Sequence, residues 1–399
     1  MKKNNKTPKL RFSGYTDDWE QRKFADFTWD AGKRNKDNLD LEPYAITNEH
    51  GFIRQSEAHD EFGYMKDTDR KAYNIVQPNS FAYNPARINV GSIGYYEGSE
   101  NVIVSSLYEV FQTDKYVNDR FLWHWLKSDQ LPRWIEKLQE GSVRLYFYYD
   151  KLCECQLHLP SLEEQEKIAA YIDSLDHLIA LHQRKLEKLQ NMKKSCLQKM
   201  FPKDGATVPE IRFSEFQGDW EERTLGSCFD ERLESLPDGE LLSVTIGSGI
   251  KKFSELDRHD NSNTDKSKYK RVCIGDIAYN SMRMWQGASG RSPYEGIVSP
   301  AYTVVKPIGD IDTQFFAYMF KKKEIIHLFE INSQGLTSDT WNLKYPAFSK
   351  IVVRVPRNVE EQSRIARFLL ELDELISCTE QEIEITKRMK KGCLQKMFV

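Results

Sequence analysis

The sequence of 399 residues has no long hydrophobic run. Its apolar stretches fall far short of the ~18 residues that a membrane-spanning helix needs. Cysteine is sparse, and the seven cysteines form no CxxC motif. Small reduced thiols are the expected state. The sequence therefore predicts a cytoplasmic protein that has no membrane contact and no disulfide framework.

Catalytic and cofactor-binding motifs are also missing. The chain contains no GxxxxGK[ST] loop, no HExxH motif and no glycine-rich methyl-donor loop after an expected strand. The stretch 84–87 (NPAR) begins like the Asn/Asp-Pro-Pro-Tyr/Phe signature of amino-methyltransferases, but it lacks the second proline and the aromatic residue. We therefore expect a protein that is not an enzyme and holds no cofactor or metal. An enzyme with a hidden methyltransferase or nuclease activity is the rival class.

An excess of one charge sign is absent as well. The 57 Lys and Arg residues are balanced by 60 Asp and Glu residues, which leaves a net charge of −3. Domains that bind nucleic acid usually carry a basic patch or stripe. Any basic surface on this chain must therefore be local and offset by acidic surface elsewhere.

What the sequence does contain is a duplication. Residues 8–27 (PKLRFSGYTDDWEQRKFADF) align with residues 209–228 (PEIRFSEFQGDWEERTLGSC) at an offset of 201. Residues 163–201 align with residues 360–398 at an offset of 197, and both segments end in CLQKMF. A duplicated chain tends to form a pseudo-two-fold object, and duplex DNA is the commonest partner with two-fold symmetry.

Each half combines a mixed region with one long helix, which predicts an α+β fold. The mixed regions contain short alternating runs typical of strands, and one shorter helix is expected in each, at 116–138 and 312–331. The predicted architecture is two repeated mixed α/β domains joined by two long antiparallel coiled-coil helices. The predicted boundaries are 8–159 and 209–355 for the domains, and 160–201 and 356–398 for the helices.

A heptad pattern runs along both long helices. Apolar residues recur with alternating steps of four and three, which is typical of a coiled-coil seam. Each helix is the simplest partner for the other, packed antiparallel. This arrangement would bring His182 near Thr379, either as a polar pair that fixes the register or as two residues at the edge of the seam. The predicted seam residues are Ile168, Ile172, Leu175, Ile179, His182, Leu186, Ile365, Leu369, Leu372, Ile376, Thr379 and Ile383.

Two glycine-containing loops in each half supply the recognition chemistry. Asn and Gln can pair with adenine, Arg can pair with guanine, and aromatic residues add rigid apolar surface. For any single residue an ordinary surface turn is the alternative, but the recurrence of both loops favours function. The candidate DNA-binding residues are Asn84, Arg87, Ser92, Ser142, Arg144, Tyr146, Asn280, Arg283, Gln286, Thr337, Ser338 and Trp341.

The repeated motifs resemble the specificity subunit of type I restriction–modification systems over essentially the full length. The resemblance rests on three motifs that each occur twice in the same order. They are the entry motif PxxRFxxFxxxW at 209–220, with Tyr15 as its third aromatic at 8–19, the EEQxxIA openings at 163–169 and 360–366, and KKxCLQKMF at 193–201 and 390–398.

This resemblance implies a non-catalytic subunit that reads a bipartite, asymmetric target in double-stranded DNA. It also implies two methyltransferase subunits bound to the helices and two restriction (motor–nuclease) subunits in the full complex. S-adenosylmethionine, ATP and Mg are then expected on those partners. The alternative is a free-standing DNA-binding repressor or architectural protein, which would not bind methyltransferase chains.

Overall fold

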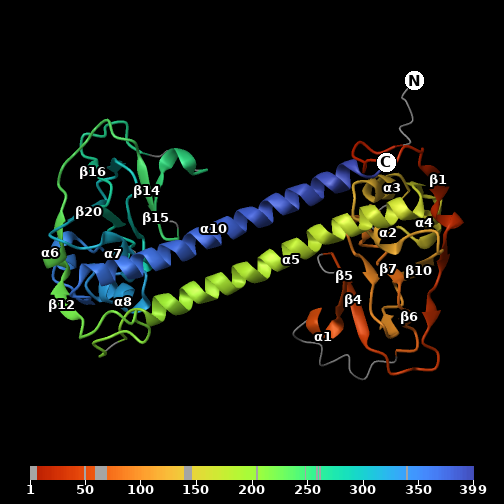
Figure 1. Cartoon of the computed structure of the whole chain (residues 1–399), viewed down its shortest axis with the longest axis horizontal. Helices are drawn as coiled ribbons and strands as arrows, with labels where there is room; N and C mark the ends of the chain where they lie inside the picture. The colour runs from red at the N-terminus through yellow and green to blue at the C-terminus, as the bar shows by residue number, and fades with distance from the viewer. Residues whose placement is uncertain are drawn as a thin grey trace. The chain divides into compact units, whose positions relative to one another are not determined.

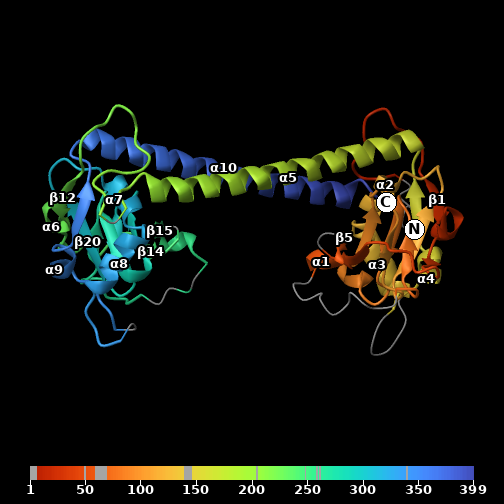
Figure 2. The same cartoon turned by 90° about the horizontal axis from the view of Figure 1, so that it is seen from below.

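A computed structural model gives the structure of the protein and describes residues 7–48, 51–58, 70–138, 146–203, 205–247, 249–257, 259, 262–337 and 340–399. The chain divides into two compact units, Met1–Gln183 with Gln381–Val399, and Arg184–Glu380. Two helices of 38 residues, α5 (Leu162–Lys199) and α10 (Val359–Lys396), each contribute one part to each unit (Figures 1 and 2). The α+β fold with two long helices is confirmed.

The described part of the first unit contains three antiparallel or mixed sheets. The pair β1–β11 closes the domain, because it joins the entry motif to the strand before α5. Side chains alternate inward along β11, so that Leu157 and Leu159 are buried. The strand orders are β1 (Glu20–Lys23)–β11 (Gln156–Leu159); β2 (Thr28–Asp30)–β10 (Glu109–Thr113)–β7 (Ser80–Tyr83)–β8 (Ile93–Tyr96); and β3 (Lys33–Arg34)–β6 (Asn74–Val76)–β9 (Val102–Val104)–β4 (Pro43–Thr47)–β5 (Gly51–Arg54).

The second unit repeats this plan. Its closing pair β12–β21 matches β1–β11, and its four-stranded sheet has the same order as β2–β10–β7–β8. The strand orders are β12 (Glu221–Thr224)–β21 (Val352–Val355); β13 (Phe229–Glu231)–β20 (Tyr302–Pro307)–β17 (Ile277–Asn280)–β18 (Ser289–Arg291); β14 (Leu242–Thr245)–β15 (Gly249–Lys252); and β16 (Lys270–Val272)–β19 (Gly296–Val298).

Short helices complete both units. The first unit contains η1 (Phe24–Asp26), α1 (Gln55–Ala58), η3 (Ile88–Val90), α2 (Asp119–Leu126), α3 (Gln130–Leu138) and α4 (Tyr149–Glu154). The second contains α6 (Leu225–Cys228), η4 (Phe253–Glu255), η5 (Met284–Gln286), α7 (Thr313–Met319), α8 (Lys323–Ile331) and α9 (Tyr345–Phe348).

The prediction of one helix at 116–138 and one at 312–331 is wrong, because each segment forms two helices. In the first unit the hydroxyl of Ser128 donates to the Trp125 carbonyl at 2.6 Å and accepts from the Gln130 N–H at 3.2 Å. Ser128 therefore lies between the two helices and bonds to the end of α2 and to the start of α3. In the second unit Lys322 stands between α7 and α8 with an extended backbone (φ −69°, ψ 141°). An extended residue cannot continue a helix.

The repeated motifs attach each long helix to its domain. Glu164 is 1% exposed and receives two hydrogen bonds of 2.8 Å from the Arg11 guanidinium. Glu361 is 2% exposed and receives the same two bonds, at the same distances, from Arg212. The side chain of the next residue, Gln165, accepts a hydrogen bond of 2.9 Å from the backbone N–H of Asn118, the N-cap residue of α2. The entry motif and the EEQ motif are therefore two sides of one internal joint.

Candidate nucleic-acid interface

The two candidate loops at Asn84 and Asn280 form the same turn. In each, the side-chain Oδ1 of the asparagine accepts a hydrogen bond of 3.0 Å from the backbone N–H two residues later, at Ala86 and at Met282. Asn84 and Asn280 therefore hold an Asx turn, and this oxygen is used inside the loop. The sequence had suggested these amides as partners for adenine.

Each turn ends in a left-handed glycine and leaves an arginine exposed. Gly91 has φ 93° and Gly287 has φ 81°, a region that L side chains rarely adopt. The next backbone N–H returns to the arginine, since Ser92 donates to the Arg87 carbonyl at 3.1 Å. Ala288 and Arg283 repeat this bond at 3.1 Å. Both arginine side chains are exposed, and the turns place them at equivalent positions.

In both units the segment that follows the second candidate loop is hydrogen-bonded to the first candidate loop. The Phe147 N–H donates to the Pro85 carbonyl at 3.0 Å, and the Leu343 N–H donates to the Ser281 carbonyl at 2.8 Å. Both offsets are 196 (343 − 147 and 281 − 85). The fold therefore brings together two segments that are about 60 residues apart in the sequence, and it does so twice.

Aromatic side chains accompany both pairs of loops. Tyr146 stacks on Tyr148 with ring centroids 5.5 Å apart. Trp341 contacts Trp285 edge to face at 5.3 Å. Trp285 was missed by the sequence reasoning, although an aromatic residue beside Arg283 was a usable signal. These rings offer rigid apolar surface on the segments that form or adjoin the two turns.

The remaining candidates occupy different environments. Ser92 is 2% exposed, and its hydroxyl donates to the Ile46 carbonyl at 2.9 Å, so this hydroxyl serves the inside of the domain. Gln286 is half-buried on the second turn, and Thr337 is exposed. The other three candidates lie outside the described residues: Ser142, Arg144 and Ser338.

The chemistry of these turns suits recognition. Neither 84–92 nor 280–288 contains a histidine, a cysteine or a carboxylate. General acid–base catalysis mostly uses such groups, and a serine nucleophile needs one of them beside it as a base. Exposed guanidinium groups, aromatic rings and backbone donors remain, and these are the groups that read base edges and bind phosphates.

The seam residues of the long helices lie buried or half-buried. The first part of α5 packs into the core of the first unit with Cys393, Met397 and Phe398 of α10 and its end. The first part of α10 packs into the core of the second unit with Leu189 and Leu197 of α5. The fully or nearly buried seam residues are Ile168, Ile172, Leu175, Ile365, Leu369, Leu372, Thr379 and Ile383, and the half-buried ones are Ile179, His182, Leu186 and Ile376.

The two polar seam residues have separate partners. His182 lies with Nε2 3.8 Å from a carboxylate oxygen of Glu382. Thr379 is fully buried, and its hydroxyl donates to the Leu375 carbonyl of its own helix at 2.7 Å. A bond of this kind satisfies the hydroxyl within one helix.

Ion pairs connect the long helices within each unit. Lys390 binds Asp176 in the first unit at 2.5 Å, and its repeat equivalent Lys193 binds Asp373 in the second. Asp173 binds the Arg120 guanidinium and accepts a bond of 2.8 Å from His124. Burial by itself would raise the pKa of Asp173, but the bonds from His124 and Arg120 outweigh it and lower this pKa to about 2.

This network contains the one group in the described part of the chain that could hold a metal ion. The ligand atoms of His124, Asp173 and Asp176 lie within 4.8 Å of one another. Arg120 and Lys390 already neutralise both carboxylates. A divalent cation would have to displace these side chains, so we interpret the group as an ion-pair network that holds α2 on the helices.

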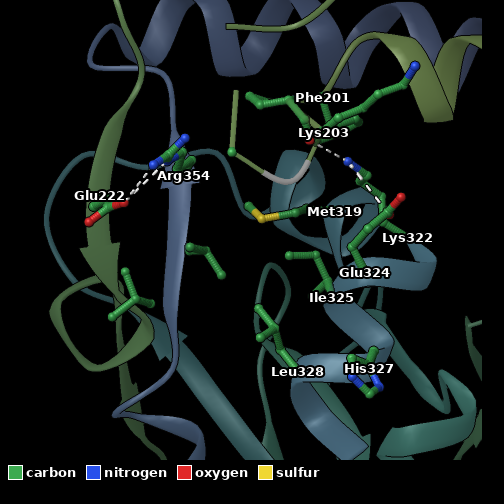
Figure 3. A pocket seen from close by; sticks show the side chains of 14 residues that line it. Phe201, Lys203, Glu222, Met319, Lys322, Glu324, Ile325, His327, Leu328 and Arg354 are labelled. Atoms are coloured by element: carbon green, nitrogen blue, oxygen red, sulfur yellow. Dashed lines mark hydrogen bonds and ion pairs between the residues drawn. The ribbon is translucent and has the colours of Figure 1, made fainter. Parts of the chain in front are cut away.

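A pocket of about 240 Å³ lies in the second unit where the chain leaves α5 (Figure 3). Its floor is apolar and includes Met319, Ile325 and Leu328. Lys322 points to the linker, where its ammonium donates to the Pro202 carbonyl at 2.9 Å and lies over the Phe201 ring. The residues that line the pocket include none of the candidate recognition residues.

In the described part of the chain, no helix is apolar and long enough to cross a membrane.

Comparison with known proteins identifies similar chains. Residues 16–191 match the family model described as the type I restriction modification DNA specificity domain. The MjaVIII specificity subunit of a type I restriction enzyme from Methanocaldococcus jannaschii is 24% identical over 414 residues, covering 94% of this chain and 91% of that protein. The putative MjaX specificity subunit from the same organism is 22% identical, with the same coverage.

A similar fold is also found among solved structures. The crystal structure of a type I restriction–modification S subunit from M. genitalium superposes with a TM-score of 0.58 at 15% identity. It covers 98% of this chain and 99% of that one. At this level of identity the likeness concerns the fold.

Proposed function

Because this chain belongs to the type I restriction–modification specificity family, we propose that it reads a bipartite, asymmetric DNA target and holds the catalytic subunits of the complex together. In this proposal residues 8–159 and 209–355 each read one half of the target. Residues 160–201 and 356–398 form the helices that carry the partners. The chain itself is not an enzyme and acts in the cytoplasm, where its DNA target lies.

One observation carries the proposal. The bond from the segment after the second loop to the first loop, Phe147 N–H to Pro85 and Leu343 N–H to Ser281, is repeated at one offset. Each copy presents one exposed arginine, and an Arg that pairs with guanine is the commonest specific contact to DNA. The loops differ in sequence, NPAR against NSMR, so the two half-targets are expected to differ.

The long helices offer an equivalent surface in each unit for a partner chain. Leu178 and Leu375 are repeat equivalents and are 37% and 48% exposed. Met192 and Met389 are also equivalents and are 49% and 47% exposed. Each unit therefore presents one such leucine and one such methionine, and exposed apolar residues at equivalent positions suit two copies of one partner.

We assign these two places to methyltransferase subunits. Two restriction (motor–nuclease) subunits complete the assembly. The partner subunits, and not this chain, bind S-adenosylmethionine, ATP and Mg. The carboxylate-poor loops described above agree with a chain that contributes recognition alone.

The test is the methylation pattern of a host that produces this chain with the methyltransferase encoded beside it. Sequencing of methylated bases should reveal one motif made of two different half-targets separated by an unread gap. A continuous motif, or methylation by the partner without this chain, would contradict the proposal. Methylation of DNA by the purified chain alone would overturn its non-catalytic role.

A further inference from the structure

One half-buried lysine in each unit binds the backbone of the candidate turn. Lys127 follows α2, and its ammonium lies 3.4 Å from the Gly91 carbonyl and 3.5 Å from the Ile93 carbonyl. Lys321 follows α7, and its ammonium lies 2.6 Å from the Gly287 carbonyl and 2.8 Å from the Ser289 carbonyl. The two lysines are therefore equivalents, and they bind the same pair of carbonyls.

The repeat offsets support this equivalence. The lysines are 194 residues apart (321 − 127), as are the helices that carry them, whose caps are Asn118 and Asp312. The bound carbonyls are 196 apart (287 − 91 and 289 − 93). The contact has persisted although the lysines and the turns lie in segments with different offsets, which indicates that the contact itself matters.

The bound carbonyls belong to the residues that shape the turn. Gly91 and Gly287 are the left-handed residues at which each turn reverses. One residue later, the backbone N–H of Ser92 closes the turn on the carbonyl of Arg87. The lysine is therefore connected to the exposed arginine through a short, hydrogen-bonded segment of backbone. By binding this segment, the lysine fixes the orientation of the peptide groups that carry the arginine.

These lysines occupy an unfavourable environment for a charge. Burial, aided by repulsion from Lys193, lowers the pKa of Lys321 to about 8. Burial, aided by repulsion from Lys390, does the same for Lys127 and lowers its pKa to about 8. Lys321 uses all three ammonium donors, since it also binds the Ile246 carbonyl at 3.0 Å. Taking an ammonium partly out of water is costly unless such bonds satisfy it.

We propose that Lys127 and Lys321 are positioning residues for base recognition, each holding the turn that presents Arg87 or Arg283 to the DNA. They act through the turn and touch no base. The inference rests on the proposed function and adds to it the residues that set how sharply each half-target is read.

The test compares three single variants in the complex with the methyltransferase, by sequencing methylated bases in the host. Lys321→Met should leave recognition of one half-target unchanged and make recognition of the other less specific. Methylation of its full target should fall by about tenfold, the change expected for the loss of a hydrogen bond from a charged donor. Lys127→Met should relax the opposite half-target. Lys321→Arg, which keeps the charge and the donors, should restore part of the selectivity.

The matched control is Lys322→Met. Lys322 is the next residue and is 6% exposed, but its ammonium binds the linker at Pro202 (Figure 3). This variant should keep both half-targets. A general loss of stability would lower methylation at all sites without changing the motif, so the relaxed half-target separates positioning from folding.

The outcomes are decisive. An unchanged motif and unchanged site occupancy in Lys321→Met and Lys127→Met would overturn the inference. If Lys321→Met fails to fold, as judged by thermal unfolding of the purified chain, Lys127→Met decides, because its bonds are longer. Failure of the proposed function looks different, since the wild-type complex itself would then show no two-part motif.

Discussion

The backbone N–H of Leu10 donates a hydrogen bond of 2.9 Å to the carbonyl of Lys396. In the other unit the N–H of Ile211 donates to the carbonyl of Lys199, also at 2.9 Å. These pairs differ by 201 (211 − 10) and 197 (396 − 199), the offsets of the repeated motifs. The segment that leads into the first domain therefore contacts the end of α10. The linker that leads into the second domain contacts the end of α5 in the same way.

This relationship predicts that a circular permutant will fold. The new chain would begin at Pro209, and Phe398 would be joined to Pro8 by a copy of residues 202–208. We expect the same methylation motif as the wild type and a similar unfolding midpoint, because the chain is opened between Val208 and Pro209, outside every helix and strand. A permutant opened inside β7 serves as the negative control. A folded permutant that reads a different target would contradict the prediction.

A second prediction concerns the buried joint between Arg11 and Glu164. Arg11→Ala would leave a carboxylate that is 1% exposed without its cation, which should destabilise the first unit by about 3–5 kcal/mol. The measurement is chemical denaturation of the purified chain. The double variant Arg11→Met, Glu164→Gln removes both charges and should recover much of the loss. Equal destabilisation by the single and double variants would show that packing, not charge, dominates this joint.

A third prediction concerns acid stability. The folded-state pKa of Asp173 is about 2, below its ordinary value of 3.8, so its stabilisation is present above pH ~4 and is lost as the pH falls toward 2. With its partial exposure, the contribution should be on the order of 1–2 kcal/mol. Asp173→Asn should therefore be less stable than the wild type at pH 7, and the difference should shrink below pH 4. Glu166 is an exposed carboxylate on the same helix. Glu166→Gln should change neither the stability at pH 7 nor its dependence on pH below pH 4.

A fourth prediction concerns the exposed leucines of the long helices. Leu178→Glu and Leu375→Glu place a charge on the surface that we assign to the partners. Each single variant should lose one methyltransferase subunit, and the double variant should lose both, because the two places are equivalent. The mass of the complex by light scattering checks this. Lys185→Glu on α5 is the exposed control, and loss of binding there as well would point to a general electrostatic effect.

The last prediction rests on the proposal that the two long helices set the spacing between the two recognition domains. Deleting residues 180–186 and 377–383 removes one heptad from each helix and keeps the seam in phase. It should shorten the pair by about 10 Å, or roughly three base pairs of DNA. The domains would also rotate around the duplex by about 100°, so activity should fall sharply. Any remaining methylation should have a shorter gap, and an unchanged gap in an active variant would show that another element sets the spacing.

The sequence by itself determined the larger features of this protein. The duplication, the heptads of α5 and α10 and the α+β class follow from periodicity, which depends on residues close together in the chain. The split of 116–138 into two helices was missed, because it depends on Ser128 acting as a cap inside an apolar pattern that continues on both sides. Local pattern alone does not distinguish a buried cap from a helix interior.

The tertiary structure decided the roles of individual residues. The amides of Asn84 and Asn280 serve their own turns, Ser92 is turned inward, and the lysines at 127 and 321 bind those turns from another element. Each role is set by a hydrogen bond whose geometry is fixed only after the chain has folded, often between segments far apart in the sequence. A sequence shows which groups can form such bonds, but their partners depend on how the sheet, the turn and the helix pack together.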